Sequence, residues 1–328
     1  MPVIDIHTHV LGHEWLELLR AHGAPRYGVT DTPGKLPSIS CDGAPFLTPS
    51  PAHFDYELRI RDMDAAGVDI GILSLTCPNV YWGSAQASLR AARSTNEEMA
   101  AAQLRYPDRL RWMTSLPWMH VREALDELYR ARDAGAVGVM VLANIDGLSL
   151  TDQRFAPVWK AIDSLGLAVL VHPGAPPGTR EMSLNEYALV AAVGFMFDTT
   201  LAITRMMFDG FLDRYPNLNL IVGHAGATLP YVVGRLDACF EKMPATRTRT
   251  STRPSDWLRR MYYDTVTYSQ EALDLCIAVC GSDHVMYGSD YPHNIGDMAG
   301  CLARVDALPS ACRDAVRGHT AARVFGLE

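Results

Sequence analysis

Lysine is scarce in this chain of 328 residues: only Lys35, Lys160 and Lys242 occur among the 29 lysine and arginine residues. The formal net charge is −8 and no basic block is present, which argues against a nucleic acid or an anionic membrane as partner. No apolar run approaches the roughly 18 residues that cross a bilayer, and no export signal precedes the first predicted strand. We therefore expect a soluble, cytoplasmic protein.

The chain also lacks the spacings that mark disulfide frameworks, structural zinc sites and dinucleotide-binding loops. Its seven cysteines are odd in number and include no CxxC pair, so free thiols are expected. No GxGxxG sequence follows the first predicted strand, which disfavours an open dinucleotide-binding sheet. Apolar residues make up 48% of the chain and charged residues 20%, as in a globular protein with a full core.

Short apolar runs typical of buried parallel strands alternate with longer segments of helical periodicity. Strands are predicted at residues 3–9, 68–75, 110–116, 137–142, 167–172, 218–224, 261–265 and 285–290. Helices are predicted between them, at residues 54–66, 87–106, 122–134, 155–164, 199–214, 229–242 and 270–279, with further helices closing the chain. Eight strands alternating with helices predict an α/β fold, a (β/α)8 TIM-like barrel formed by residues 1–328 as a single domain.

Residues 10–53 depart from this rhythm and are crowded with glycine and proline. A long segment of this kind inside a compact domain is typically a functional lid or is disordered. Because it directly follows the first strand, we expect residues 10–53 to form an irregular active-site lid inserted after that strand.

Five side chains able to bind a metal lie at the carboxyl ends of predicted strands, where barrels of this type carry their chemistry. They are His7 and His9 of the first strand, His172, His224 and Asp290. Side chains alternate across a strand, so His7 and His9 point in the same direction. Each residue alone could be structural, but five such placements make coincidence improbable.

Three imidazoles and one carboxylate suit a single divalent ion with open positions, and zinc is favoured while manganese stays open. The expected ligands are His7, His9, His172 and Asp290. His224 is then left to handle a proton or polarise a substrate oxygen. Among the other histidines, we expect His293 near the site, because it follows Asp290 by three residues.

Four motifs give the chain a resemblance to a known family: HTH at residues 7–9, VHP at 171–173, GHAG at 223–226 and YGSDYP at 287–292. They resemble the metal-dependent decarboxylase branch of the amidohydrolase superfamily, typified by 2-amino-3-carboxymuconate-6-semialdehyde decarboxylase and including hydroxybenzoate and methylsalicylate decarboxylases. The resemblance implies a barrel with one divalent ion on the four ligands above, and His224 as the catalytic histidine. Binuclear relatives carry a lysine after strand four, whereas residues 141–144 contain none, so a mononuclear site is implied.

The resemblance also implies a homodimer. An arginine in a GR[LV]D sequence reaches the neighbouring protomer's site in that family, and Arg235 stands in a matching sequence at residues 234–237. Arg235 is thus expected to bind substrate in the partner's site. The alternative is a solvated arginine paired with Asp237 or Glu241.

We expect a carboxy-lyase that removes CO2 from a carboxylated aromatic or conjugated small acid without oxidation, with Asp290 as ligand and possible proton carrier. Residues 41–47 contain no cation, where muconate semialdehyde decarboxylases carry lysine and arginine, which favours hydroxylated aromatic acids and a role in aromatic compound catabolism. The alternatives are a mononuclear hydrolase of an amide, lactone or C–C bond, which would use the same ligands, and a metal-binding scaffold without activity.

Overall fold

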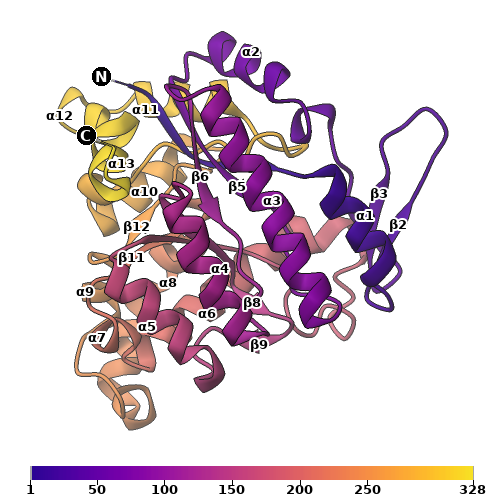
Figure 1. Ribbon diagram of the computed structural model, residues 1–328. Coiled ribbons are helices and arrows are strands. Elements are labelled where there is room, and N and C mark those ends of the chain that lie inside the picture. Colours follow the sequence, from indigo (N-terminus) through magenta and orange to yellow (C-terminus); the bar gives the residue numbers. More distant parts are fainter. Residues whose placement is uncertain (1, 328) are drawn as a thin grey trace.

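The computed structural model describes residues 2–327. A curled sheet of seven parallel strands forms its centre (Figure 1). In spatial order the strands are β1 (Ile4–Val10), β5 (Ile70–Leu75), β6 (Leu110–Thr114), β7 (Gly138–Leu142), β10 (Ala168–His172), β11 (Asn219–Val222) and β12 (Tyr262–Tyr263). Every residue of β1, β7 and β10 is buried, and β7 and β10 accordingly read as nearly continuous apolar runs in the sequence. The predicted α/β class with a parallel sheet is therefore confirmed.

The predicted strand at residues 285–290 is not a regular strand. The segment nevertheless lies between β12 and β1 and hydrogen-bonds to both. The N–H of Met286 donates to the carbonyl of Tyr263 at 2.8 Å, and the N–H of Ile6 donates to the carbonyl of Tyr287 at 3.0 Å. The end of this segment is thus fixed beside the end of β1.

Helices cover the outside of the sheet (Figure 1). They are α2 (Tyr56–Ala66), α3 (Ala85–Arg105), α4 (Val121–Asp133), α5 (Ala156–Leu165), α6 (Phe195–Phe208), α7 (Phe211–Arg214), α8 (Leu229–Lys242), α9 (Pro254–Leu258), α10 (Gln270–Cys280), α11 (Met298–Asp306), α12 (Ser310–Asp314) and α13 (Thr320–Phe325). The prediction of one helix over residues 199–214 is wrong, because Gly210 adopts a φ of 64° and separates α6 from α7.

Residues 10–53 have regular structure, so the expectation of an irregular segment is wrong. They contain α1 (His13–His22), an antiparallel sheet of β2 (Tyr27–Thr30), β3 (Ser38–Cys41) and β4 (Ala44–Leu47), and the short helix η1 (Pro51–His53). Helix α1 buries Trp15 and Leu19 completely. Asp42 and Gly43 both adopt positive φ between β3 and β4, the conformation that an Asp-Gly pair favours in a tight hairpin.

One helical stretch, Glu186–Phe208, is long and apolar enough to cross a bilayer by length and composition alone. Asp198 and Arg205 interrupt this stretch, so it is not an uninterrupted apolar run of the roughly 18 residues that cross a bilayer. Its C-terminal part is α6, which buries Ile203 and Met206 but leaves Phe197 and Leu201 about half exposed. Only 28% of the apolar window is buried, so much of this face is uncovered in a single chain.

Candidate metal centre

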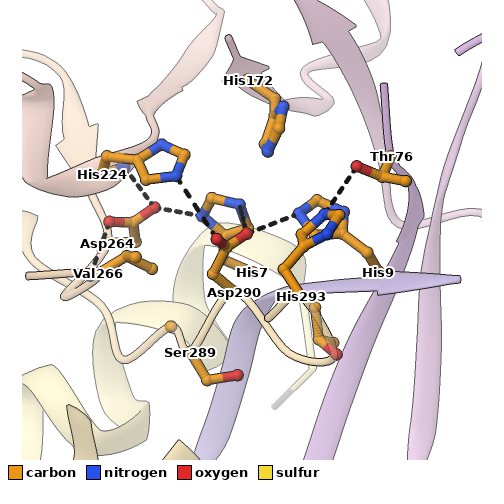
Figure 2. Close-up of polar contacts among 12 residues, drawn as sticks. His7, His9, Thr76, His172, His224, Asp264, Val266, Ser289, Asp290 and His293 are labelled. Atoms are coloured by element: carbon orange, nitrogen blue, oxygen red, sulfur yellow. Dashed lines mark hydrogen bonds and ion pairs between the residues drawn. The ribbon is translucent and has the colours of Figure 1, made fainter. Parts of the chain in front are cut away.

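The five residues predicted from strand ends converge on one point (Figure 2). His7 and His9 come from β1, His172 ends β10, His224 follows β11, and Asp290 follows the segment beside β1. The ring centroids of His9 and His172 are 4.7 Å apart, and those of His7 and His224 are 5.0 Å apart. Asp290 Oδ1 lies 3.4 Å from His7 Nε2 and 3.2 Å from His9 Nε2.

Three imidazole nitrogens at the centre are buried without a hydrogen-bond partner in the described residues: His7 Nε2, His172 Nε2 and His224 Nδ1. A buried polar atom without a hydrogen bond is costly and points to a ligand that satisfies it. Imidazole nitrogens with a carboxylate are a donor set for a divalent transition metal, so the residues present fit such an ion. Candidate ligand atoms of His7, His172, His224 and Asp290 lie within 4.8 Å of one another, and those of His9, Asp290 and His293 form a second set.

The remaining ring nitrogens are held by neighbouring groups. His9 Nδ1 lies 3.1 Å from the hydroxyl of Ser74, and His172 Nδ1 lies 2.8 Å from the carbonyl of Pro173. Contacts of this kind fix the orientation and tautomer of a metal-binding imidazole. They leave the Nε2 atoms free to point toward the shared centre.

Asp264, which sequence reasoning missed, holds His7 in the same way. Its Oδ2 lies 2.5 Å from His7 Nδ1, and its two oxygens accept hydrogen bonds from the backbone N–H groups of His224 and Ala225 at 2.8 and 2.7 Å. The available signal was a carboxylate near the end of the predicted strand at residues 261–265. One buried side chain therefore positions two elements of the site.

Arg59 is a second residue that the sequence did not indicate. Its buried guanidinium donates to the Thr8 hydroxyl and to the His9 carbonyl, and it lies over the Tyr291 ring at 4.8 Å from the centroid. Tyr291 in turn accepts the His9 N–H at 2.7 Å through its carbonyl. The backbone on both sides of His9 is thus fixed by α2 and by the segment after Asp290.

Burial and charge set the protonation of the site. Burial lowers the pKa of His9 and His172 well below the usual range, so both rings are neutral, as ligands must be. Burial alone would lower the pKa of His7, but the Asp264 carboxylate outweighs it and raises that pKa. Burial opposes ionisation of Asp290, yet the surrounding histidines hold its pKa well below the usual range, which keeps the carboxylate charged.

The backbone at the site is strained. His224 and Asp290 adopt φ values of 56° and 60°, in the left-handed region that residues other than glycine rarely occupy. Such conformations concentrate at functional sites, where the surrounding structure enforces them. Close packing adds a further constraint, because a Cβ on Gly288 would lie 2.9 Å from the Cβ of His7.

His293 lies beside the metal centre, as expected from its position after Asp290. Its ring centroid is 4.9 Å from that of His9, and its Nε2 is 2.8 Å from the hydroxyl of Thr76 (Figure 2). Unlike His7 and His9, His293 keeps partial exposure. The site therefore remains accessible on the side of His293.

A small pocket adjoins the centre beneath residues 10–53. It is lined by Arg26, Tyr27, Phe46, Cys77, Pro78, Tyr81, Leu142, Asn144, Asp146, Gly174 and Ala175. Leu142 pairs with His172 in the sheet, and Gly174 follows His172 by two residues, so the pocket lies next to this ligand. Arg26 forms an ion pair with Asp146 across it. Residues 10–53 thus bring one cation, Arg26, to the pocket, although residues 41–47 within them contain none.

Arg235 is exposed on α8 and makes no hydrogen bond or ion pair within residues 2–327. The alternative that it pairs with Asp237 or Glu241 is not what the structure shows. Those carboxylates lie 3.2 and 2.9 Å from the guanidinium of Arg253. Arg235 therefore remains available to a group outside the described chain.

A parallel α/β sheet that presents buried histidines and an aspartate beyond its strand ends defines a metalloenzyme scaffold. The amidohydrolase family model matches residues 4–327, and the chain belongs to that family.

Three relatives share most of their length with this chain. The 2-amino-3-carboxymuconate-6-semialdehyde decarboxylase of Dictyostelium discoideum is 27% identical over 332 residues, which cover 99% of this chain and 92% of that protein. The crystal structure of 5-carboxyvanillate decarboxylase LigW from Sphingomonas paucimobilis has a TM-score of 0.85 and 27% identity, covering 99% of both chains. The D314N mutant of 5-carboxyvanillate decarboxylase LigW2 from Novosphingobium aromaticivorans, solved with bound manganese, has a TM-score of 0.83 and 25% identity, covering 99% and 97%.

Proposed function

We propose that this protein is a metal-dependent decarboxylase that removes CO2 without oxidation from a carboxylated aromatic or conjugated small acid. The observation that carries the proposal is the buried histidine and aspartate set, with unpartnered Nε2 atoms on His7 and His172, in a chain that matches decarboxylases over almost all its length. We further propose that residues 1–328 form a single (β/α)8 barrel domain with residues 10–53 as its active-site lid, and that the protein is cytoplasmic.

The ion would be held by His7, His9, His172 and Asp290. When bound, it would supply Lewis-acid stabilisation of negative charge on the substrate's carboxylate and neighbouring oxygen. We favour zinc on ligand type, and the manganese bound to a related decarboxylase keeps that metal open.

His224 is proposed to handle the proton. Decarboxylation breaks the C–C bond to the carboxylate, releases CO2 and leaves a carbon that must take up a proton. His224 Nε2 is 3.8 Å from Asp290 Oδ2, and its Nδ1 has no partner in the described residues. The side chain is 9% exposed, so it can exchange a proton with solvent or with substrate beside the buried ligands. The carboxylate of Asp290 lies beside His224, is ionised, and can assist this proton transfer.

The pocket beside His172 is lined by aromatic and apolar side chains. Tyr27 and Phe46 approach it from residues 10–53, while Tyr81 and Leu142 approach it from the sheet side. Arg26 can exchange its ion pair with Asp146 for an acidic substituent of the substrate. These residues support a small carboxylic acid as substrate.

We propose a homodimer in which Arg235 completes the partner's site. Arg235 is unpaired in the described chain, and Tyr231, one helical turn before it, is 83% exposed. The Thr200 hydroxyl lies 2.7 Å from that of Thr228, which joins α6 to the start of α8. The exposed Phe197 of α6 and Tyr231 of α8 therefore supply an apolar surface that a second copy would cover.

The decisive experiment incubates metal-loaded protein with a panel of hydroxylated and carboxylated benzoates and measures CO2 and the organic product. Decarboxylation predicts equal amounts of CO2 and of the acid's decarboxylated product. Hydrolysis of an amide, lactone or C–C bond, without CO2 from any acid, would replace the proposal with the hydrolase alternative.

A further inference from the structure

A group of polar side chains next to the metal centre has no part in the chemistry above. Thr76 follows β5, His293 follows Asp290, and His53 ends η1 at the close of residues 10–53. The Thr76 hydroxyl lies 2.8 Å from His293 Nε2, and the ring centroids of His293 and His53 are 5.3 Å apart. The three side chains thus form one contacting polar cluster. It adjoins His9, whose ring centroid is 4.9 Å from that of His293.

His53 carries a buried donor without an acceptor. The residue is 1% exposed, and its Nδ1 accepts the backbone N–H of Ser50 at 3.0 Å. Burial lowers the pKa of His53 to about 3, so the ring is neutral and carries its single proton on Nε2. Within residues 2–327 this Nε2 has no hydrogen-bond partner. A buried N–H in this state is costly unless an acceptor from outside the chain reaches it.

His293 stands on the accessible side of the centre. Thr76 occupies its Nε2, and the other ring nitrogen makes no hydrogen bond in the described part of the chain. Because His7 and His9 are fully buried, a small molecule reaches them past the partly exposed His224 and His293. A substrate that enters there lies against the ring of His293.

We infer that His293 and His53 form a subsite that binds a hydrogen-bond-accepting oxygen of the substrate, a hydroxyl or carbonyl substituent distinct from the carboxylate that is lost. This inference rests on the proposed function, which brings a small acid to the neighbouring centre. Thr76 is the positioning residue, since it fixes the His293 ring. The Nε2–H donor of His53 suits an uncharged substituent and distinguishes substrates that differ only in that oxygen.

The test measures binding by titration calorimetry of metal-loaded protein. The probes are 2-hydroxybenzoate and the four dihydroxybenzoates that add one hydroxyl to it at position 3, 4, 5 or 6. His53→Asn keeps an acceptor near the Nδ1 position for Ser50 and removes the donor at Nε2, whereas His53→Gln keeps a donor near Nε2. His293→Phe removes the second imidazole. Thr76→Val keeps that imidazole but removes the hydroxyl that holds its Nε2. His13→Phe is the matched control, because His13 is exposed on α1 and its ring stacks on that of Phe54 at 4.6 Å between centroids.

We expect at least one dihydroxybenzoate to bind more tightly than 2-hydroxybenzoate, by roughly two- to tenfold for each hydrogen bond gained. His53→Asn should remove this preference while the affinity for 2-hydroxybenzoate and the metal content stay unchanged, and His293→Phe should remove the preference as well. His53→Gln and His13→Phe should retain it, and Thr76→Val should weaken it.

The inference is overturned if no dihydroxybenzoate binds more tightly than 2-hydroxybenzoate. It is also overturned if the preference survives both His53→Asn and His293→Phe, because these side chains then do not bind the substrate's hydroxyl. It is also overturned if His293→Phe loses metal while His53→Asn changes nothing, since His293 is then a ligand. CO2 release is scored separately. Absence of CO2 with an intact binding preference rejects the proposed function, whereas CO2 release without the preference rejects only the subsite.

Discussion

Asp264 Oδ2 lies 2.5 Å from Nδ1 of His7, a residue that we expect to bind the metal. The same carboxylate accepts the backbone N–H groups of His224 and Ala225. A carboxylate on the distal nitrogen of a metal-binding histidine fixes its tautomer and strengthens it as a ligand. Asp264 therefore connects a proposed ligand with the residue proposed to handle the proton.

Asp264→Asn is expected to weaken metal binding about 10- to 100-fold, since it removes the charge that holds His7 and one of the two acceptor oxygens. Titration against a chelator of known affinity measures the change. Asp283→Asn is the matched control, because Asp283 lies 3.9 Å from His284 Nε2 but is 77% exposed and remote from the centre. Equal metal affinity in the Asp264→Asn variant and the unmodified protein would contradict the role given to Asp264.

His224→Ala is expected to retain the metal and to lose activity by about 10²- to 10⁴-fold, the usual contribution of a general acid or base. His7→Ala and Asp290→Ala should lose the metal as well as activity. Metal analysis after gel filtration separates the two results. A metal-free His224→Ala protein would mean that His224 is a ligand, in keeping with its place in the set formed with His7, His172 and Asp290.

Protein purified without chelator is expected to contain about one equivalent of zinc per chain, because imidazole ligands favour zinc over manganese in the order of divalent affinities. Elemental analysis gives the content, and reconstitution of the metal-free protein with each ion gives the activity. Manganese at one equivalent with little zinc would reverse this choice.

The buried carboxyl of Asp198 is expected to make the free energy of unfolding depend on pH. Burial raises its pKa to about 6 from the ordinary value of 3.8, while its carboxylate accepts the Gly174 N–H at 3.0 Å and the Asn144 amide N–H at 2.9 Å. Because this pKa is higher in the folded protein than in the unfolded chain, the folded protein binds the carboxyl proton more tightly. The contribution of Asp198 to the free energy of unfolding therefore falls as pH rises from about 4 to about 6. The loss is on the order of 3 kcal/mol at pH 7.

Asp198→Asn should therefore gain stability relative to the unmodified protein as pH rises from 4 to 7, in urea unfolding at each pH. Asp163→Asn is the control, since Asp163 also accepts a backbone N–H, from Asn217 at 2.8 Å, but is partly exposed. If the difference in free energy of unfolding between Asp198→Asn and the unmodified protein does not vary with pH, ionisation of the Asp198 carboxyl does not destabilise the folded protein as proposed.

The sequence predicts the parallel sheet well because buried strands are uninterrupted apolar runs, and each places its last residue at one edge of the sheet. This is why His172 at the end of β10 and His224 after β11 could be brought together from sequence alone. The Asp42-Gly43 hairpin carried a recognisable turn signal that was missed, because the many glycines and prolines around it suggested an irregular segment.

Other features depend on contacts between distant residues, which no local pattern reveals. His7 and Asp264 are 257 positions apart in the sequence, and Arg59 reaches the carbonyl of His9 in β1 from helix α2. The segment at residues 285–290 has strand-like composition, but the N–H groups of Tyr287 and Gly288 donate to the Val316 carbonyl and the Thr265 hydroxyl, so the regular ladder is not formed. Contacts with other parts of the chain therefore override the local propensity of the segment.

Mixing two inactive variants tests whether Arg235 acts across a dimer interface. Arg235→Ala should lower activity without loss of metal, since Arg235 is exposed on α8 and unpaired in the described residues. In a dimer that combines His224→Ala with Arg235→Ala, one site lacks both groups, and the other has its own His224 and the partner's intact arginine. Equal mixing with free exchange makes half of the dimers mixed, so activity should recover to about a quarter of that of the unmodified protein. Arg247→Ala, which removes an exposed arginine whose guanidinium contacts the Glu241 carbonyl, is the control and should keep full activity without a partner variant. Failure of complementation in a mixed dimer shown to form, or full activity of a monomer, would reject the shared site.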